Sequence, residues 1–139
     1  MLDAFPRRAQ PTGIVDVEIR IVGAGAAAPT VAMGPKGEPA TGGNAGVTSG
    51  RSGVGVYTLT FPEKPGKFVG WTWSHGHTTP TATTPRIVQV DPDSLDSDNI
   101  LNFITITPAT DAAAAAAYEL TTADVVCLTL KFKQTGKGV

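Results

Sequence analysis

The sequence predicts an all-β fold, an antiparallel β-sandwich of about seven to eight strands with a jelly-roll-like topology. Three observations lead to this prediction. Short segments alternate apolar and polar residues, which is the pattern of strands with one buried face. The 16 glycines and 11 prolines separate these segments with turn signals. No segment repeats at a period of about 20–50 residues, so solenoids and propellers are excluded and one sandwich domain is expected.

Composition and charge narrow the classes of partner. The formal net charge is −1 over 139 residues, which gives no electrostatic reason to expect nucleic acid or an anionic membrane as a partner. No apolar run approaches the length of a membrane span, and the first residues do not form a secretory signal. The single cysteine, Cys127, cannot make an internal disulfide. Stability is therefore expected to come from burial or from assembly, in a protein made in a reducing cytoplasm.

The two ends of the chain are expected to lie outside the sandwich. Residues 1–13 show no periodicity and predict an extended N-terminal arm, which either frays or docks on a neighbour through Leu2 and Phe5. Residues 134–139 predict a polar tail. The single sandwich domain is therefore expected to span residues 14–133.

The first strand is expected over Ile14–Val22, where alternate residues are apolar, and Gly23–Ala28 follows it directly. This run of glycine and alanine matches the spacing of a dinucleotide-binding fingerprint. The fingerprint needs a helix after it and, before it, a parallel strand that is apolar on both faces. Here prolines and further glycines follow, and the preceding strand has one polar face. A turn of small residues is therefore expected, with no cofactor.

Residues 34–55 predict a long, exposed Gly-rich loop. The loop has few apolar residues with which to pack, so we expect it to become ordered through contact with another chain. A short apolar run that ends at Met33 precedes the loop, and the loop itself contains Lys36 and Arg51.

The centre of the core is expected to be a hairpin of two strands, Gly53–Pro62 and Lys67–Trp73. The first strand alternates large apolar residues with threonines, which suits a half-buried pleated surface. Its final proline cannot donate to a ladder, and the Pro-Gly pair that follows predicts a turn. Both tryptophans of the chain lie in the second strand.

A second polar loop is expected from Ser74 to Pro85, and it holds the two histidines of the chain, His75 and His77. Two histidines one residue apart could share a metal on one face of a strand. However, Gly76 between them favours a turn, and no further histidine or cysteine completes a set. We therefore expect a surface loop and no metal site.

Two later segments are expected to be irregular. Asp91–Asp98 holds four carboxylates but lacks the glycine and the closing glutamate of a calcium loop, so it predicts an acidic turn, with a weak cation site left open. Ala112–Ala117 predicts a short helix or an irregular segment, capped by Thr110 or Asp111.

Three further strands complete the predicted sandwich. Arg86–Val90 forms a short one. Asn99–Thr107 is apolar on both faces near its middle, which predicts either a central strand or a face that meets a neighbouring subunit. Val125–Lys133 alternates, so Val126 and every second residue after it should point inward, whereas Cys127 should point outward.

No catalytic set is visible in the sequence. The candidate bases are the two histidines of the expected loop, and Ser49–Gly53 lacks the strand before and the helix after that a nucleophile elbow requires. The acidic residues look solvated, whereas glycoside hydrolysis needs one acid in an apolar pocket. Cys127 lies within a strand, where a structural thiol is expected. The chain is therefore not expected to be an enzyme.

Two segments resemble small β-sandwich proteins of tailed-bacteriophage virions. Arg51–Phe61, with the sequence Arg-Ser-Gly-Val-Gly-Val-Tyr-Thr-Leu-Thr-Phe, is similar to a strand motif of these proteins. The end of the chain resembles them too: an Ala-rich stretch, then Leu-Thr-Thr-Ala-Asp-Val-Val, then an amphipathic strand to Lys133. The layout over about residues 47–133 is similar to capsid decoration, or cement, proteins.

The resemblance implies a structural virion protein with neither active site nor cofactor, made in the host cytoplasm and located on the outer capsid surface. Such a protein binds the major capsid protein, often as a homo-oligomer such as a dimer or trimer, and stabilises the shell by bridging capsomers. The residues expected to contact the partner lie in the arm and in the two loops. They are Leu2, Phe5, Arg7, Arg8, Met33, Lys36, Arg51, His75 and His77.

One alternative function remains open at this point. Tail-fibre tips share the first motif, so the chain could be a receptor- or carbohydrate-binding module. In that case Trp71 and Trp73 would be exposed platforms on which a sugar stacks, whereas a purely structural role would bury at least one of them.

Overall fold

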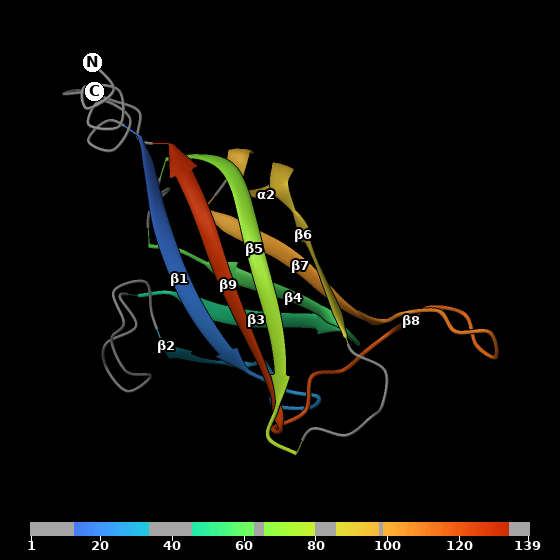
Figure 1. The fold of residues 1–139 in the computed structure, drawn as a ribbon. Coiled ribbons are helices and arrows are strands. Elements are labelled where there is room, and N and C mark those ends of the chain that lie inside the picture. Colours follow the sequence, from blue (N-terminus) through green and yellow to red (C-terminus); the bar gives the residue numbers. More distant parts are fainter. Residues whose placement is uncertain (1–12, 34–45, 63–65, 80–85, 98, 134–139) are drawn as a thin grey trace.

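Two antiparallel sheets face each other in the computed structural model, which describes residues 13–33, 46–62, 66–79, 86–97 and 99–133 (Figure 1). The predicted all-β sandwich is confirmed, with nine strands in the described residues. The elements are β1 (Ile14–Val22), β2 (Thr30–Met33), β3 (Thr48–Gly53), β4 (Val56–Thr60), β5 (Lys67–His77), β6 (Ile87–Asp91), α2 (Pro92–Ser97), β7 (Ile100–Thr107), β8 (Ala116–Ala117) and β9 (Asp124–Lys133). The described part of the chain contains no helix with the length and apolar character that a membrane span requires.

The first sheet, sheet A, has the strand order β2-β1-β9-β5. β9 lies inside this sheet and pairs along its length with β1 on one side and with β5 on the other. Its inward residues are fully buried, which confirms the predicted alternation: Val126, Leu128, Leu130 and Phe132. Cys127 between them is exposed, also as predicted.

The second sheet, sheet B, has the order β3-β4-β7-β6, and β8 pairs with the end of β7. β7 lies between β4 and β6, so it is the central strand that its apolar faces predicted. Tyr57 of β4 stacks on Phe103 of β7 with ring centroids 5.4 Å apart, and both side chains are buried. Rings of this size contribute much of the apolar area of a core.

The predicted central hairpin is wrong. β4 pairs with β3 and β7 in sheet B, whereas β5 pairs with β9 in sheet A. The chain between them passes from one sheet to the other instead of turning back on itself. The alternation correctly predicted that Tyr57, Leu59 and Phe61 are buried. It could not predict the pairing, because strands of one hairpin and strands of two facing sheets bury their apolar faces alike.

The predicted loop over residues 34–55 is wrong in its last part. β3 runs through Thr48–Gly53 and pairs antiparallel with β4. The small and polar residues of β3 show no apolar alternation, so the sequence carried little signal for this strand. Gly55, with φ of 69°, closes the turn into β4. Residues 34–45 of the predicted loop lie outside the described residues.

The prediction of a polar loop from Ser74 is wrong at its start, because β5 continues through Gly76 to His77. Gly76 pairs with Val125 of β9. Pairing with β9 therefore holds both histidines in a strand, and the glycine between them does not make a turn.

A short helix replaces the predicted acidic turn. Asp91 caps α2, because its carboxylate accepts a hydrogen bond from the Asp93 amide over 3.0 Å. Pro92 occupies the first helical position, where its missing N–H costs nothing. Leu95 is fully buried and attaches the helix to the core.

The Ala-rich segment forms no helix. The amides of Ala112 and Ala113 donate to the Thr110 hydroxyl oxygen over 3.3 and 3.1 Å, which makes a turn at the predicted cap. Ala116 and Ala117 then pair with β7 as β8. All the alanines of this segment are exposed, so no buried face stabilises a helix of this length.

Candidate functional site

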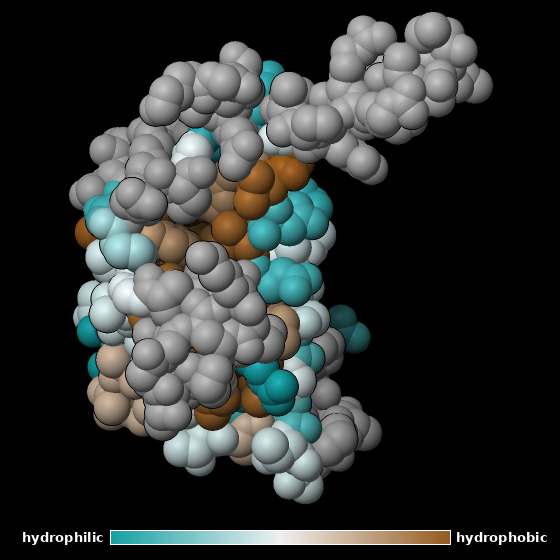
Figure 2. Space-filling model, turned by 90° about the vertical axis from the view of Figure 1, so that its left-hand side faces the viewer, coloured by the Kyte–Doolittle hydropathy of each residue, from teal (hydrophilic) through white to brown (hydrophobic). Residues whose placement is uncertain are grey.

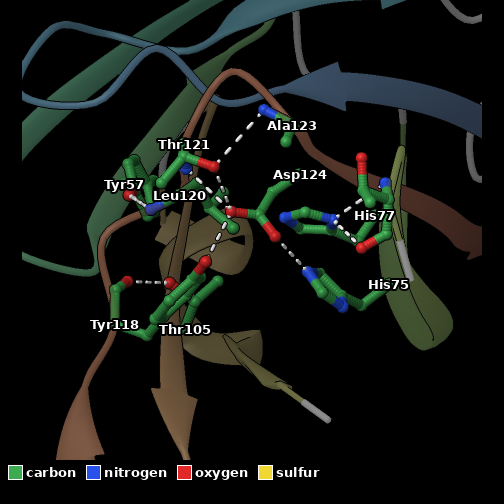
Figure 3. A network of polar contacts seen from close by, with 10 residues as sticks. Tyr57, His75, His77, Thr105, Tyr118, Leu120, Thr121, Ala123 and Asp124 are labelled. Atoms are coloured by element: carbon green, nitrogen blue, oxygen red, sulfur yellow. Dashed lines mark hydrogen bonds and ion pairs between the residues drawn. The ribbon is translucent and has the colours of Figure 1, made fainter. Parts of the chain in front are cut away.

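A cluster of polar contacts lies where the chain crosses from sheet B to sheet A, at residues 118–124 (Figure 3). Its centre is the fully buried Asp124 at the start of β9. One carboxylate oxygen accepts hydrogen bonds from the Tyr118 hydroxyl over 2.7 Å and from the Thr121 amide over 2.8 Å. The Thr121 hydroxyl also donates to it, over 3.0 Å. The other carboxylate oxygen lies 2.7 Å from Nε2 of His75 on β5.

A second set of contacts holds the beginning of the same crossing on sheet B. The guanidinium of Arg51 on β3 donates two hydrogen bonds to Glu119, of which the one from Nε spans 2.8 Å. The Tyr57 hydroxyl on β4 donates to Glu119 over 3.1 Å and accepts from the Leu120 amide over 2.8 Å. The side chains of Arg51 and Tyr57 thereby join β3 and β4 to the crossing.

These contacts change the pKa of several groups. Burial raises the pKa of Asp124, but the hydrogen bonds from Thr121, Tyr118 and His75 outweigh it, so the pKa lies below its ordinary value. The hydrogen bonds from Arg51 lower the pKa of Glu119. Burial raises the pKa of the Tyr57 phenol, which therefore stays protonated at neutral pH. Both carboxylates remain charged and hydrogen-bonded inside the fold.

The pair of His75 and Asp124 has the geometry in which a carboxylate orients an imidazole. The His75 side chain is only 12% exposed. No serine, threonine or cysteine side chain within the described ranges bonds to its ring. Among the described residues, the contact between His75 and Asp124 connects β5 to the crossing.

The residues that the structure describes contain no group of three His, Cys, Asp or Glu side chains that could hold a metal ion. The ring of His77 accepts a hydrogen bond from the Thr79 amide over 3.0 Å, whereas His75 contacts Asp124. The sequence interpretation missed the contact with Asp124, because the two residues are 49 positions apart and Asp124 follows a stretch with the composition of a turn.

The structure describes four of the residues predicted to contact a partner. Arg51 and His75 hold the two ends of the same crossing through Glu119 and Asp124. His77 is exposed at the end of β5, and Met33 ends β2. The remaining predicted contacts lie outside the described residues: Leu2, Phe5, Arg7, Arg8 and Lys36.

The Gly23–Ala28 segment packs against the crossing, as a turn of small residues. The Gly23 amide donates to the Asp124 carbonyl over 3.1 Å, and the Gly25 amide donates to the Leu120 carbonyl over 2.9 Å. A Cβ on Gly23 would lie 2.4 Å from the Thr121 carbonyl oxygen, so only glycine permits this approach. The amides that a pyrophosphate would need are thus bonded within the fold.

β5 is an edge strand of sheet A and carries a partly exposed aromatic pair. Trp71 and Trp73 lie on the same face of the strand as the buried Phe68, and their exposed fractions are 37% and 39%. Phe68 stacks on Trp71 with centroids 5.5 Å apart. Each indole therefore packs partly on the core and remains accessible to a ligand.

Two other parts of the surface are less distinctive. A shallow hollow of about 470 Å³ lies beside the end of β5 and is lined by Arg20, His77 and Cys127, among others. On the side of β1 and β2, the visible described surface mixes hydrophobic and hydrophilic residues in small areas (Figure 2). The hollow brings Arg20, His75, His77 and Cys127 to its lining, but it contains no carboxylate.

Comparison of the chain with protein-family models, with curated proteins and with solved structures gives no match. The function is therefore inferred from the residues and contacts of the chain itself.

Proposed function

We propose that this protein is a structural component of a tailed-phage virion: a capsid decoration protein that binds the outer surface of the major capsid protein shell and stabilises it by bridging capsomers. It acts by binding, without a catalytic site or a cofactor. It is made in the host cytoplasm and then resides on the capsid surface.

One observation carries this proposal. The two segments that resemble decoration proteins are far apart in the chain but touch in the structure. Tyr57 in the first segment bonds to Leu120 in the second, and Arg51, at the start of the first segment, bonds to Glu119, which lies between the Ala-rich stretch and Leu120. The resemblance therefore falls on residues that act together to frame the sandwich, as expected if it reflects a shared scaffold.

The hydrogen bonds of two carboxylates to neighbouring strands support the same function. Asp124 and Glu119, the two carboxylates whose pKa is lowered, are bonded to side chains of neighbouring strands. Such groups stabilise a frame that has to stay folded while its surface is bound. A protein that reinforces a shell needs this kind of stability.

The experiment that tests the proposal is a measurement of copy number. Virions that contain this protein would be purified on a density gradient, and its copies per major capsid protein counted by quantitative mass spectrometry. A decoration protein is present in a fixed, high ratio to the shell protein. A few copies per particle would overturn the proposal and point to a tail location.

The role of the arm and of the Gly-rich segment can be tested separately. Deletion of residues 2–12, or shortening of residues 34–45, leaves β1 and β3 intact. Both variants are expected to fold but to occupy capsids less than the full chain does. Normal occupancy for both would show that the attachment lies elsewhere on the molecule.

A second candidate function, a receptor- or carbohydrate-binding module, is favoured by the exposure of Trp71 and Trp73. Sugars stack on accessible indole rings, and such contacts change tryptophan fluorescence. Titration with host-surface polysaccharides would show a saturable change in emission for the full chain and none for Trp73→Ala. The absence of any change would remove this candidate.

A further inference from the structure

β5 is the outer strand of sheet A, and its backbone is paired on one side (Figure 1). The Thr78 amide donates to the Ala123 carbonyl just before β9 over 2.9 Å, in register with the pairing of β5 and β9. Bonded and unbonded pairs alternate in an antiparallel ladder, so every second residue of β5 directs its N–H and C=O groups away from β9. We call their amides the outer amides, which belong to Trp71, Trp73, His75 and His77. Within the described residues, no other backbone group pairs with them on that side.

Among the described strands, the other edges of the two sheets have features that limit strand addition. β2 has four residues and β6 has five, and β3 contains Arg51. Short edge strands and charged side chains are common ways to protect a sheet edge. β5 has 11 residues, and from Gly70 to His77 it contains no proline, lysine, arginine or carboxylate. This stretch of the edge is therefore open to another strand.

The side chains beside this edge leave room for an added strand. On the outward face of sheet A, β5 carries glycine, threonine and serine from Gly70 to Gly76, and a Cβ at either glycine would meet nothing within 4 Å. On the inner face, Trp71 and Trp73 are more than a third exposed although they pack partly on the core. Apolar side chains of an added strand would cover these indoles, since aromatic side chains pair favourably with apolar cross-strand neighbours.

The charges near this edge favour an acidic partner. Lys67 of β5 lies directly opposite Lys133 of β9, and both are exposed. Like charges at opposite positions of a sheet repel each other. The one carboxylate on β5 and β9 is that of Asp124, which is buried and hydrogen-bonded. A strand that brings an acidic side chain beside Lys67 would relieve this repulsion.

We propose that β5 accepts an extended segment of the shell protein, which adds to the four strands of sheet A as a fifth. A regular row of unpaired N–H and C=O groups is complementary to another polypeptide backbone, and in strand addition these hydrogen bonds supply the affinity. The segment is free of proline, apolar where it faces Trp71 and Trp73, and acidic beside Lys67. This inference rests on the proposed function, because it names the contact through which the shell is bound.

Hydrogen exchange tests this contact, with shells assembled without this protein as the probe. Exchange at single amides of the natural chain would be followed by mass spectrometry with fragmentation, in the free protein and in the protein bound to shells. The outer amides should exchange rapidly in the free protein and about tenfold or more slowly on the shells. The alternate amides of β5 bond to β9 and should be protected in both states.

A pair of variants separates strand addition from stacking on the indole. Trp73→Pro removes an outer N–H, and because this group does not bond to β9, the fold should be preserved, which circular dichroism would check. Trp73→Ala lacks the same indole but keeps the N–H. Trp73→Pro should therefore bind the shells about tenfold or more weakly than Trp73→Ala does. If Trp73→Pro fails to fold, hydrogen exchange in the natural chain decides the question alone.

Several results would overturn the inference. Outer amides that stay unprotected in shell-bound protein would place the attachment elsewhere and leave the decoration function intact. Equal binding by the two variants would show that the outer N–H is not used. Outer amides that are protected in the concentrated protein without shells would assign the edge to a second copy of the chain. A chain that does not bind shells at all would overturn the proposed function as well.

Discussion

At the scale of single residues, Asp124 holds together parts of the chain that are distant in sequence. Its carboxylate contacts β5 through His75 and the crossing through Tyr118 and Thr121. It carries a negative charge with no solvent exposure, which is costly unless hydrogen bonds compensate. The geometry supplies these bonds, so the stability of the fold should depend on this one side chain.

Replacement of Asp124 by Asn is expected to lower the free energy of unfolding by about 2–3 kcal/mol. The amide keeps the shape of the carboxylate but presents an NH₂ group to donors or to the His75 ring. Urea unfolding followed by circular dichroism would measure the loss. The control is Asp16→Asn, because Asp16 pairs with Lys131 on the exposed face of sheet A and should cost less than about 0.5 kcal/mol. Equal losses in the two variants would contradict the prediction.

The lowered pKa of Asp124 also predicts a loss of stability in acid. Its pKa is lower in the folded chain than in the unfolded chain, so the unfolded state binds more protons as the pH falls. The contribution of Asp124 is therefore complete above the unfolded pKa of about 3.9 and is lost as the pH drops through the folded pKa. The free energy of unfolding should fall more steeply in acid for the natural chain than for Asp124→Asn. Identical slopes would show that Asp124 does not carry this dependence.

At the scale of elements, the turn between β3 and β4 requires glycine. Gly55 has φ of 69°, and a Cβ there would lie 2.7 Å from the Thr105 carbonyl oxygen and 2.9 Å from that of Tyr118. The Gly55 carbonyl in turn accepts a hydrogen bond from the Thr105 amide over 2.9 Å. This close approach of backbones holds the β3–β4 turn against the end of β7.

Gly55→Ala is accordingly expected to cost about 3 kcal/mol or more, because the added methyl group is both strained and obstructed by backbone. Gly76→Ala is the matched variant in β5, where nothing lies within 4 Å of the added atom. It should change stability by less than about 1 kcal/mol. Thermal and urea unfolding of both variants would measure the difference. A Gly55→Ala protein as stable as Gly76→Ala would show that the turn can open.

The aromatic pair of β5 leads to a prediction about fluorescence. Trp71 and Trp73 are each more than a third exposed and yet pack partly on the core. Emission from each should therefore lie between that of a core tryptophan and that of an unfolded chain. Trp71→Phe and Trp73→Phe isolate one indole at a time, and acrylamide quenching would measure its accessibility. A blue-shifted, quencher-resistant emission from both single-tryptophan proteins would contradict the partial exposure.

Some elements could be predicted from the sequence because their alternation reflects burial on one face. Ile19 and Ile21 of β1, Leu59 of β4 and Leu128 of β9 all point inward as predicted. The neighbours of each strand could not be predicted, because alternation shows which residues face inward but not which strand lies alongside. For this reason the sequence predicts a hairpin of β4 and β5, although the two strands lie in different sheets.

The polar cluster around Asp124 could not be predicted from the sequence, for a different reason. Glu119, Thr121 and Asp124 have the composition of a surface turn, and of the three only Asp124 is buried. Glu119 and Asp124 are held by Arg51 and His75, which are distant in the sequence. The sole signal in the sequence was the resemblance, which singled out two segments that prove to be in contact at Tyr57 and Leu120. Tyr57 and Leu120 are 63 residues apart in the sequence, so local sequence patterns could not predict their contact.

At the scale of the whole molecule, sheet A depends on a strand near the end of the chain. β9 lies between β1 and β5, and its register pairs Ile14 with Lys133 and Lys67 with Lys133. Without β9, β1 and β5 would each lose most of their backbone partners in this sheet. The core would also lose four fully buried side chains, because Val126, Leu128, Leu130 and Phe132 all lie on this strand.

A chain that ends at Ala123 is therefore expected to lose cooperative unfolding, since both sheet A and the contacts of Asp124 are gone. The control is a chain that ends at Lys133, which keeps every described strand and should unfold with the same midpoint as the full chain. Thermal unfolding followed by circular dichroism would compare them. A sharp transition in the shorter chain would mean that sheet B and β1 fold without their partner.

The late position of β9 has a consequence for how the protein comes into being on the ribosome. Chains fold as their segments emerge, but β1 and β5 cannot be joined until β9 has left the exit tunnel. Until then their unpaired edges and apolar faces are open to other nascent chains. Pairing across more than a hundred residues is also slow to nucleate. Sheet A therefore cannot be completed before β9 is available, and the yield of folded protein should depend on how often the unpaired strands contact other chains before that point.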